Sequence, residues 1–61
     1  MRPEQIIKLR ELLGMTQERL AEEIGAQRST VARWENGKHE PRGGYLKALK
    51  KLEAKAKKKH K

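Results

Sequence analysis

Cysteine is absent from this 61-residue chain, and its absence excludes the covalent supports on which many small domains depend. Neither a disulfide nor a thiolate metal site can stabilise the fold. A chain without cysteine also suits a reducing compartment, so we expect a cytoplasmic protein. Aspartate and phenylalanine are missing as well, and the aromatic residues are one tryptophan and one tyrosine.

Long apolar runs are also absent. No stretch approaches the roughly 20 apolar residues of a membrane span, and the N-terminus lacks the apolar segment of a signal peptide. The only groups that titrate near neutrality, His39 and His60, have no partner at metal-ligand or catalytic spacing. We therefore expect no membrane association, no metal, no cofactor, no small-molecule substrate and no enzymatic activity.

The net charge of +8 is unevenly distributed along the chain. Residues 47–61 carry eight lysines and one glutamate, a charge of +7, whereas residues 1–46 carry the remaining 8 basic and 7 acidic side chains, a charge of +1. Net charge alone is therefore weak support for a nucleic-acid partner. At this length we expect one small domain over residues 1–56, followed by a lysine-rich, frayed tail over residues 57–61.

Apolar periodicity predicts four helices and no strand, so the expected fold class is all-α, a small four-helix domain. Pro3 suits the first position of a helix, Thr16 is a good N-cap, and Gly14 and Gly25 can close helices in the left-handed conformation. Gln27 is a poor N-cap. The predicted helices cover residues 3–13, 17–24, 27–36 (starting at Gln27 or Arg28) and 45–56, with a loop over residues 38–42.

The apolar side chains of these four helices should share one core. Ala21 is small where a second helix would approach its backbone, and Trp34 shares a helical face with Val31, which makes it a core residue rather than a stacking platform. The predicted core consists of Ile6, Leu9, Leu13, Leu20, Ile24, Val31, Trp34, Leu46, Leu49 and Leu52, with alanines at close contacts.

Residues 17–36 combine two short helical patterns with a glycine break between them, at Gly25. In the helix predicted over residues 27–36, the side opposite Val31 and Trp34 should carry the polar residues. No acid occurs between Gly25 and Trp34. A face without negative charge suits a polyanionic ligand. The polar side comprises Arg28, Ser29, Ala32, Arg33 and Asn36.

The run LRELLGMTQERLAEEIGAQRSTVARWENGKHEPR resembles the lambda-repressor-like helix-turn-helix family, the Cro and phage-repressor class, over roughly Ile6 to Leu52. The resemblance combines TQ at the start of the second helix, LA within it, IG at the turn, STVARWENG in the third helix and a following proline. It implies a DNA-binding transcriptional regulator, repressor-like, whose third helix enters the major groove of double-stranded DNA.

The same resemblance implies roles for individual residues. Arginine can bond guanine and glutamine can bond adenine in bidentate fashion, which suits base recognition. The implied base contacts are Gln27, Arg28, Ser29 and Arg33. The implied phosphate contacts are Thr16, Gln17, Asn36 and Lys38, with Arg42 and Tyr45 as weaker candidates. Arg10 and Glu35 match a partly buried ion pair between the first and third helices, with Arg10 also close to phosphate.

The chain departs from that family in two respects. Many relatives have a fifth helix that often supplies a dimer interface, so we expect a monomer in solution, with a dimer on DNA left open. The composition of LKALKKLEAKAKKK suggests a designed or trimmed member as plausibly as a natural one.

Two other functions fit the same sequence. An antitoxin-like module would bind a partner protein through its C-terminal helix, using Tyr45, Leu49, Leu52 and Ala56. Burial of these residues in the isolated chain would argue against that function. The lysine tail could instead adhere without specificity to RNA or acidic membranes.

Overall fold

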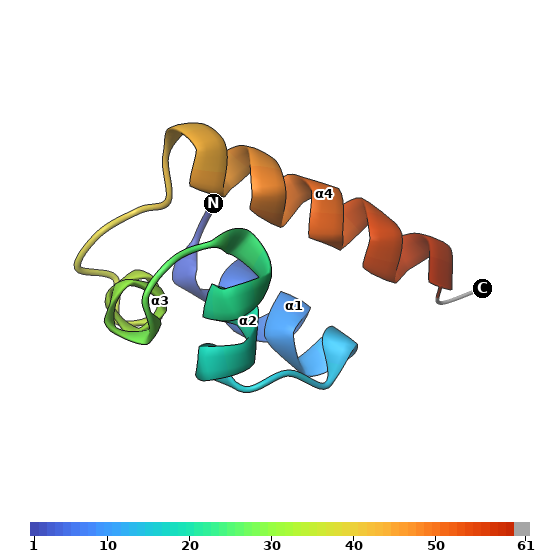
Figure 1. Ribbon diagram of the computed structural model, residues 1–61, viewed down its shortest axis with the longest axis horizontal. Coiled ribbons are helices and arrows are strands. Elements are labelled where there is room, and N and C mark those ends of the chain that lie inside the picture. The colour runs from blue at the N-terminus through green and yellow to red at the C-terminus, as the bar shows by residue number, and fades with distance from the viewer. Residues whose placement is uncertain (60–61) are drawn as a thin grey trace.

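The computed structural model describes residues 1–59, with side chains as far as Lys57. Within this range the chain forms helices and no strand, so the predicted all-α fold is confirmed. Figure 1 shows the three shorter helices gathered beneath one longer helix. In chain order they are α1 (Pro3–Leu13), α2 (Gln17–Ile24), α3 (Arg28–Glu35) and α4 (Gly43–Lys59).

The ends of α1 and α2 are set by local backbone chemistry. Pro3 occupies the start of α1, where its missing N–H is not needed. The Thr16 hydroxyl oxygen accepts a hydrogen bond of 3.1 Å from the backbone N–H of Arg19, which caps α2 as predicted. At the end of α2, Gly25 adopts a φ of 74°, and this left-handed residue allows the tight turn into α3. No side-chain hydrogen bond caps α3 at Gln27.

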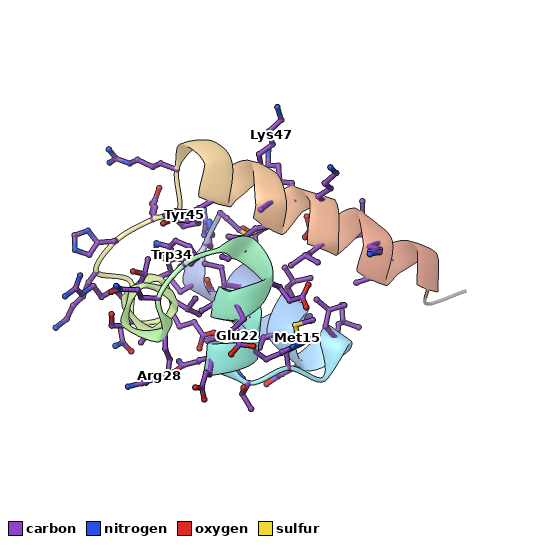
Figure 2. The ribbon with its side chains drawn as sticks, in the orientation of Figure 1. Met15, Glu22, Arg28, Trp34, Tyr45 and Lys47 are labelled. Atoms are coloured by element: carbon purple, nitrogen blue, oxygen red, sulfur yellow. The ribbon has the colours of Figure 1, made fainter. Side chains whose placement is uncertain are left out.

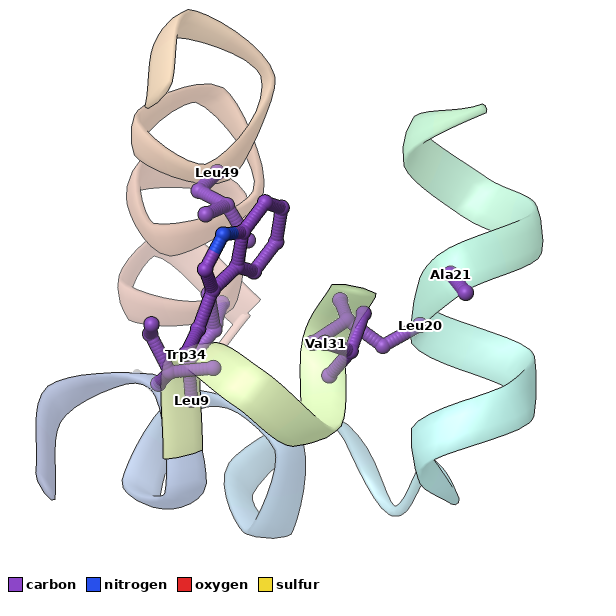
Figure 3. Close-up of a cluster of buried hydrophobic side chains, with 8 residues drawn as sticks. Leu9, Leu20, Ala21, Val31, Trp34 and Leu49 are labelled. Atoms are coloured by element: carbon purple, nitrogen blue, oxygen red, sulfur yellow. The ribbon is translucent and has the colours of Figure 1, made fainter. Parts of the chain in front are cut away.

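The core lies where all four helices meet, and it follows the predicted apolar stripes. Trp34 of α3 extends alongside Leu49 of α4, and Val31 faces Leu20 of α2 (Figure 3). The buried set consists of Ile6, Leu9, Leu20, Ala21, Val31, Trp34, Leu49 and Ala56. Leu13, Ile24 and Leu52 are half-buried at the margin of this cluster, together with Met1, Met15 and Ala26.

Three predicted boundaries are wrong in detail. The third helix ends at Glu35, although Asn36 keeps a right-handed helical conformation. The fourth starts at Gly43 instead of Tyr45, and it continues to Lys59 instead of ending at Ala56. Lysine is a good helix former and no glycine or proline stops the helix, so residues 57–59 continue α4. Residues 60–61 of the expected tail lie outside the described residues.

One predicted core residue is less enclosed than expected. Leu46 is half-buried and does not belong to the central cluster. On a helix, Leu46 lies about 60° from Leu49, so it sits at the edge of the apolar stripe. Pro41, in the loop before α4, is buried although the sequence pattern did not place it in the core.

The molecule is elongated because α4 extends beyond the other helices. Its principal dimensions are 33 × 21 × 19 Å. In Figure 1 the longest axis is horizontal, with α3 near one end and the C-terminal turns of α4 at the other. The second helix packs chiefly against α3, whereas α1 packs against both α3 and α4.

Leu49→Ala should lower the free energy of unfolding by about 2 to 5 kcal/mol, because it empties a fully buried site. Leu12→Ala is the matched control, since Leu12 is 52% exposed. That variant should change stability by less than about 0.5 kcal/mol. Urea denaturation followed by circular dichroism measures both. Equal losses in the two variants would contradict the assignment of Leu49 to the core.

Candidate functional site

The outward face of α3 carries the four residues implied as base contacts. Gln27, Arg28, Ser29 and Arg33 are all exposed. Figure 2 shows Arg28 extending away from the body of the molecule, while Trp34 points into it. The apolar side of α3 packs against the core. Its opposite side therefore presents two arginines to solvent.

One carboxylate joins this helix to the two helices before it. Glu35 Oε2 accepts a hydrogen bond of 2.8 Å from Arg10 Nε, and Oε1 accepts one of 3.2 Å from Arg10 Nη2. The Gln17 side chain donates from Nε2 to Oε1 at 3.0 Å. Arg10 also donates from Nη1 to the Met15 carbonyl oxygen at 3.2 Å. The ion pair expected between Arg10 and Glu35 is therefore present, and Gln17 is a third member that the sequence did not indicate.

This network keeps Glu35 ionised although its side chain is only 6% exposed. Burial raises the pKa of the carboxyl group, but the hydrogen bonds from Arg10 and Gln17 and the charge of Arg10 outweigh it. The net pKa lies below the ordinary glutamate value. The hydrogen bond with Glu35 likewise raises the pKa of Arg10, against the effect of burial. The negative charge at the inner side of α3 is thus neutralised by Arg10.

The start of α2 provides backbone donors beside the same network. Thr16 is exposed, and its hydroxyl already accepts the capping hydrogen bond, which leaves the hydroxyl hydrogen free to donate. The Gln17 side-chain nitrogen is directed to Glu35, so what this residue offers toward solvent is its backbone N–H. The first turn of a helix favours anions, and this end of α2 has that character.

A groove beside α3 brings Arg33 together with three of the residues implied as phosphate contacts. Arg33, Lys38, Arg42 and Tyr45 line it, bringing the end of α3, the following loop and the start of α4 together. Tyr45 packs on Trp34 with ring centroids 5.6 Å apart and an angle of 59° between the rings. Asn36 is exposed next to this groove in sequence but does not line it.

The other residues that line the groove were not among the predicted contacts, and they include one acid, Glu40, besides Trp34 and Gly37. Thr30 lines the groove from α3, and the exposed His39 lines it from the loop. Thr30 precedes Arg33 by three residues, and this helical spacing would have placed both on one side. His39 lies between two basic groove residues in sequence, but only the course of the loop shows that it shares their groove.

The acidic residues of α2 are partly neutralised within that helix. Arg19 Nη1 lies 3.5 Å from Glu22 Oε1, and Nη2 lies 2.9 Å from Glu23 Oε2. In the described part of the chain, no group of three His, Cys, Asp or Glu side chains is arranged to hold a metal ion. Nor does any described helix have the length and apolar character needed to cross a membrane.

Comparison with known proteins gives one family match. A family model described as helix-turn-helix matches residues 6–52, which include α2, Gly25 and α3. The searches of curated proteins and of solved structures gave no match.

Glu35→Gln should lower the free energy of unfolding by about 1 to 2 kcal/mol near neutral pH, because it weakens a charged hydrogen-bond network. The pH dependence provides a second readout. Since the pKa of Glu35 is lower in the folded chain, its contribution is complete above the unfolded pKa of about 4.3 and is lost as pH falls through the folded pKa.

The variant should therefore lose less stability on acidification than the parent chain. Exposed Glu18 provides the matched control, and Glu18→Gln should change the free energy of unfolding near neutral pH by less than about 0.5 kcal/mol. Denaturant titrations at a series of pH values measure these differences. Identical acid dependence in the parent and Glu35→Gln would show that this carboxylate is not stabilised by the network.

Proposed function

We propose, from the premise that this chain belongs to the helix-turn-helix family, that it binds double-stranded DNA at preferred sequences and regulates transcription by occupying them. Domains of this family bind double-stranded DNA and are not enzymes. In the proposed complex α3 enters the major groove, where base pairs present distinguishable patterns of donors and acceptors.

The outward face of α3 is the observation that carries this proposal. Four exposed polar residues lie on it, and Glu35, the only acid in the helix, is turned into the protein and paired with Arg10. A duplex approaching this face meets positive charge and hydrogen-bond donors. Arg28 and Arg33 are assigned to guanine edges, with Gln27 and Ser29 as the adjoining base contacts.

Phosphate contacts would surround this face on two sides. On one side, the start of α2 offers the Thr16 hydroxyl and the Gln17 backbone N–H. On the other, the groove offers Lys38 and Arg42, with Asn36 and the Tyr45 hydroxyl nearby. Arg10 is paired with Glu35 and is 22% exposed, so it contributes through the guanidinium N–H groups that its bonds to Glu35 and the Met15 carbonyl oxygen leave free.

The alternative protein-binding module receives no support from the packing of α4. Leu49 is fully buried and Ala56 is 5% exposed, so neither is free for a partner. Leu52 is half-buried against the same core, and Tyr45 packs on Trp34. Of the four residues, Tyr45 alone is exposed, at 40%, so most of the apolar stripe of α4 is occupied within the isolated chain.

A binding-site selection on randomised duplexes tests the proposal directly, and one substitution tests the assignment of α3. Arg33→Ala should cost about 1 to 3 kcal/mol on the selected site and relax the preference at one base position. Lys38→Ala, its control, should weaken binding to selected and scrambled duplexes alike.

A single half-site in the selected motif indicates a monomer on DNA, and a palindrome a dimer. Failure to enrich any motif would refute sequence-specific binding, and a uniform loss with Arg33→Ala would make Arg33 a phosphate contact.

Binding should also depend strongly on salt. With roughly 6 phosphate contacts, affinity should fall about a thousandfold between 50 and 200 mM salt, because each contact releases counterions from the duplex. Fluorescence anisotropy of a labelled duplex over a salt series measures the slope. A slope near zero would contradict a phosphate-dominated interface.

A further inference from the structure

The outer side of α4 carries a row of lysines that the proposed recognition of DNA does not use. The exposed lysines of this helix define what we term the lysine face: Lys47, Lys50, Lys51, Lys55 and Lys57. The only acid of the helix, Glu53, is half-buried and lines a hollow with Gln5, Lys8 and Leu12 of α1. Lys57 lines the same hollow, and Lys51 and Lys55 line another with Glu23 of α2, whose carboxylate is already paired with Arg19. The lysines of this face therefore outnumber the acids beside them.

Helical geometry arranges these lysines opposite the core. Lys47, Lys51 and Lys55 follow one another at intervals of four residues, or about 6 Å of rise each. They lie on the far side of the helix from Leu49 and Ala56, whose burial fixes the rotation of α4. Among the described side chains no ion pair involves a lysine of this face. Their charges are thus available to an external ligand.

The lysine face is directed away from the reading side of α3. In Figure 1, α4 starts near α3 and runs along the longest axis to the opposite end of the molecule, and that axis measures 33 Å. Figure 2 shows Lys47 and Arg28 extending from different sides of the body. A duplex held by α3 would lie at one end of this axis, so Lys51 and Lys55, farther along α4, would remain uncovered.

We propose that the lysine face binds a second segment of double-stranded DNA through its phosphates, so that one chain bridges two duplexes. The inference rests on the proposed function for the first duplex, held by α3. The second contact needs no base recognition, because lysine acts on phosphate as a point charge and reads no sequence. The bridge would therefore join a preferred site to any nearby duplex.

Two other polyanions fit this face less well. A helix that lies on a membrane inserts a continuous apolar face, but Leu49 of α4 is fully buried and Leu52 packs against the core. The apolar groups beside the lysines are limited to Gly44 and Ala48 and to a hollow that Lys51 and Lys55 line with Ile24 and Leu52. Single-stranded RNA is held largely by stacking on aromatic side chains, and Tyr45, the only aromatic residue of α4, packs on Trp34. A surface on which exposed lysines predominate matches the phosphate backbone of a duplex.

A capture experiment with the full chain tests the proposal. A duplex carrying the selected site is fixed to beads, the protein is added, and a fluorescent duplex of scrambled sequence is then offered at about 100 mM salt. The parent protein should retain the second duplex. Lys51→Gln with Lys55→Gln should bind the fixed site within about twofold of the parent but retain the scrambled duplex about tenfold less, since two phosphate contacts are lost.

Arg28→Gln with Arg33→Gln is the charge-matched control, because it also removes two positive charges. This variant should lose its preference for the selected site while keeping the weaker attachment of scrambled duplex through α4. Circular dichroism establishes that both double variants fold. If the parent protein shows no preference for the selected site, the proposed function is refuted. If it binds the site but does not retain a second duplex, only the bridging is refuted.

Two further outcomes would overturn the proposal. Undiminished capture by the Lys51→Gln, Lys55→Gln variant would show that bridging arises elsewhere, for example from two chains that associate. Measuring the mass of the complex by light scattering identifies that case. Stronger retention of vesicles containing anionic lipid, or of single-stranded RNA, than of duplex on the lysine face would assign the face to that ligand instead.

Discussion

The Glu35 carboxylate is the point on which the arrangement of the first three helices depends. It belongs to α3, yet it accepts hydrogen bonds from Arg10 of α1 and Gln17 of α2. A buried carboxylate without such partners would be strongly destabilising, so the three helices are required to keep the relative positions that supply them. The same bonds turn the only acid of α3 away from its outer surface. One network therefore serves both the packing of the helices and the charge of the face that we assign to DNA.

The apolar core complements this polar network. Burial of Trp34 and Val31 fixes the rotation of α3, and Leu49 packs α4 against Trp34. A chain of 61 residues buries a modest fraction of its surface, so few of these contacts are redundant. No described buried side-chain polar atom lacks a hydrogen-bond partner. The small size of the domain is thus compatible with a single well-defined arrangement.

Much of this fold is predictable because its signals are local. The helix ends depend on single residues such as Pro3, the Thr16 cap and the glycine breaks, and the helices themselves follow from the apolar period. The ion pair of Arg10 with Glu35 follows from the family resemblance. The end of α4 was misjudged because a lysine run has no stop signal and periodicity weakens where apolar residues cease. The Gln17 contact with Glu35 depends on the angle between α2 and α3, which no local pattern encodes.

The candidate site likewise has one part that local sequence patterns predict and another that depends on tertiary packing. The outward residues of α3 follow from helical spacing, whereas the groove depends on how residues 36–42 return to α4. Thr30 and His39 join Arg33 there only through that return. The direction in which α4 carries its lysines is likewise a property of the tertiary packing. Charge counted along the sequence placed the excess in residues 47–61, but only the packing of α4 shows which side of the molecule those lysines occupy.

The register of α3 is held at both ends, by the left-handed turn at Gly25 and by the buried ring of Trp34. Inserting or deleting a residue between them would rotate everything beyond that point by about 100° and destroy the surface. Exchanging an outward side chain would leave the core untouched, since Gln27, Arg28, Ser29 and Arg33 are all exposed. Under the proposed function, stability and ligand preference are therefore carried by different residues in and next to one short helix. A scaffold of that kind acquires new targets by point substitution alone, while its length is not free to vary.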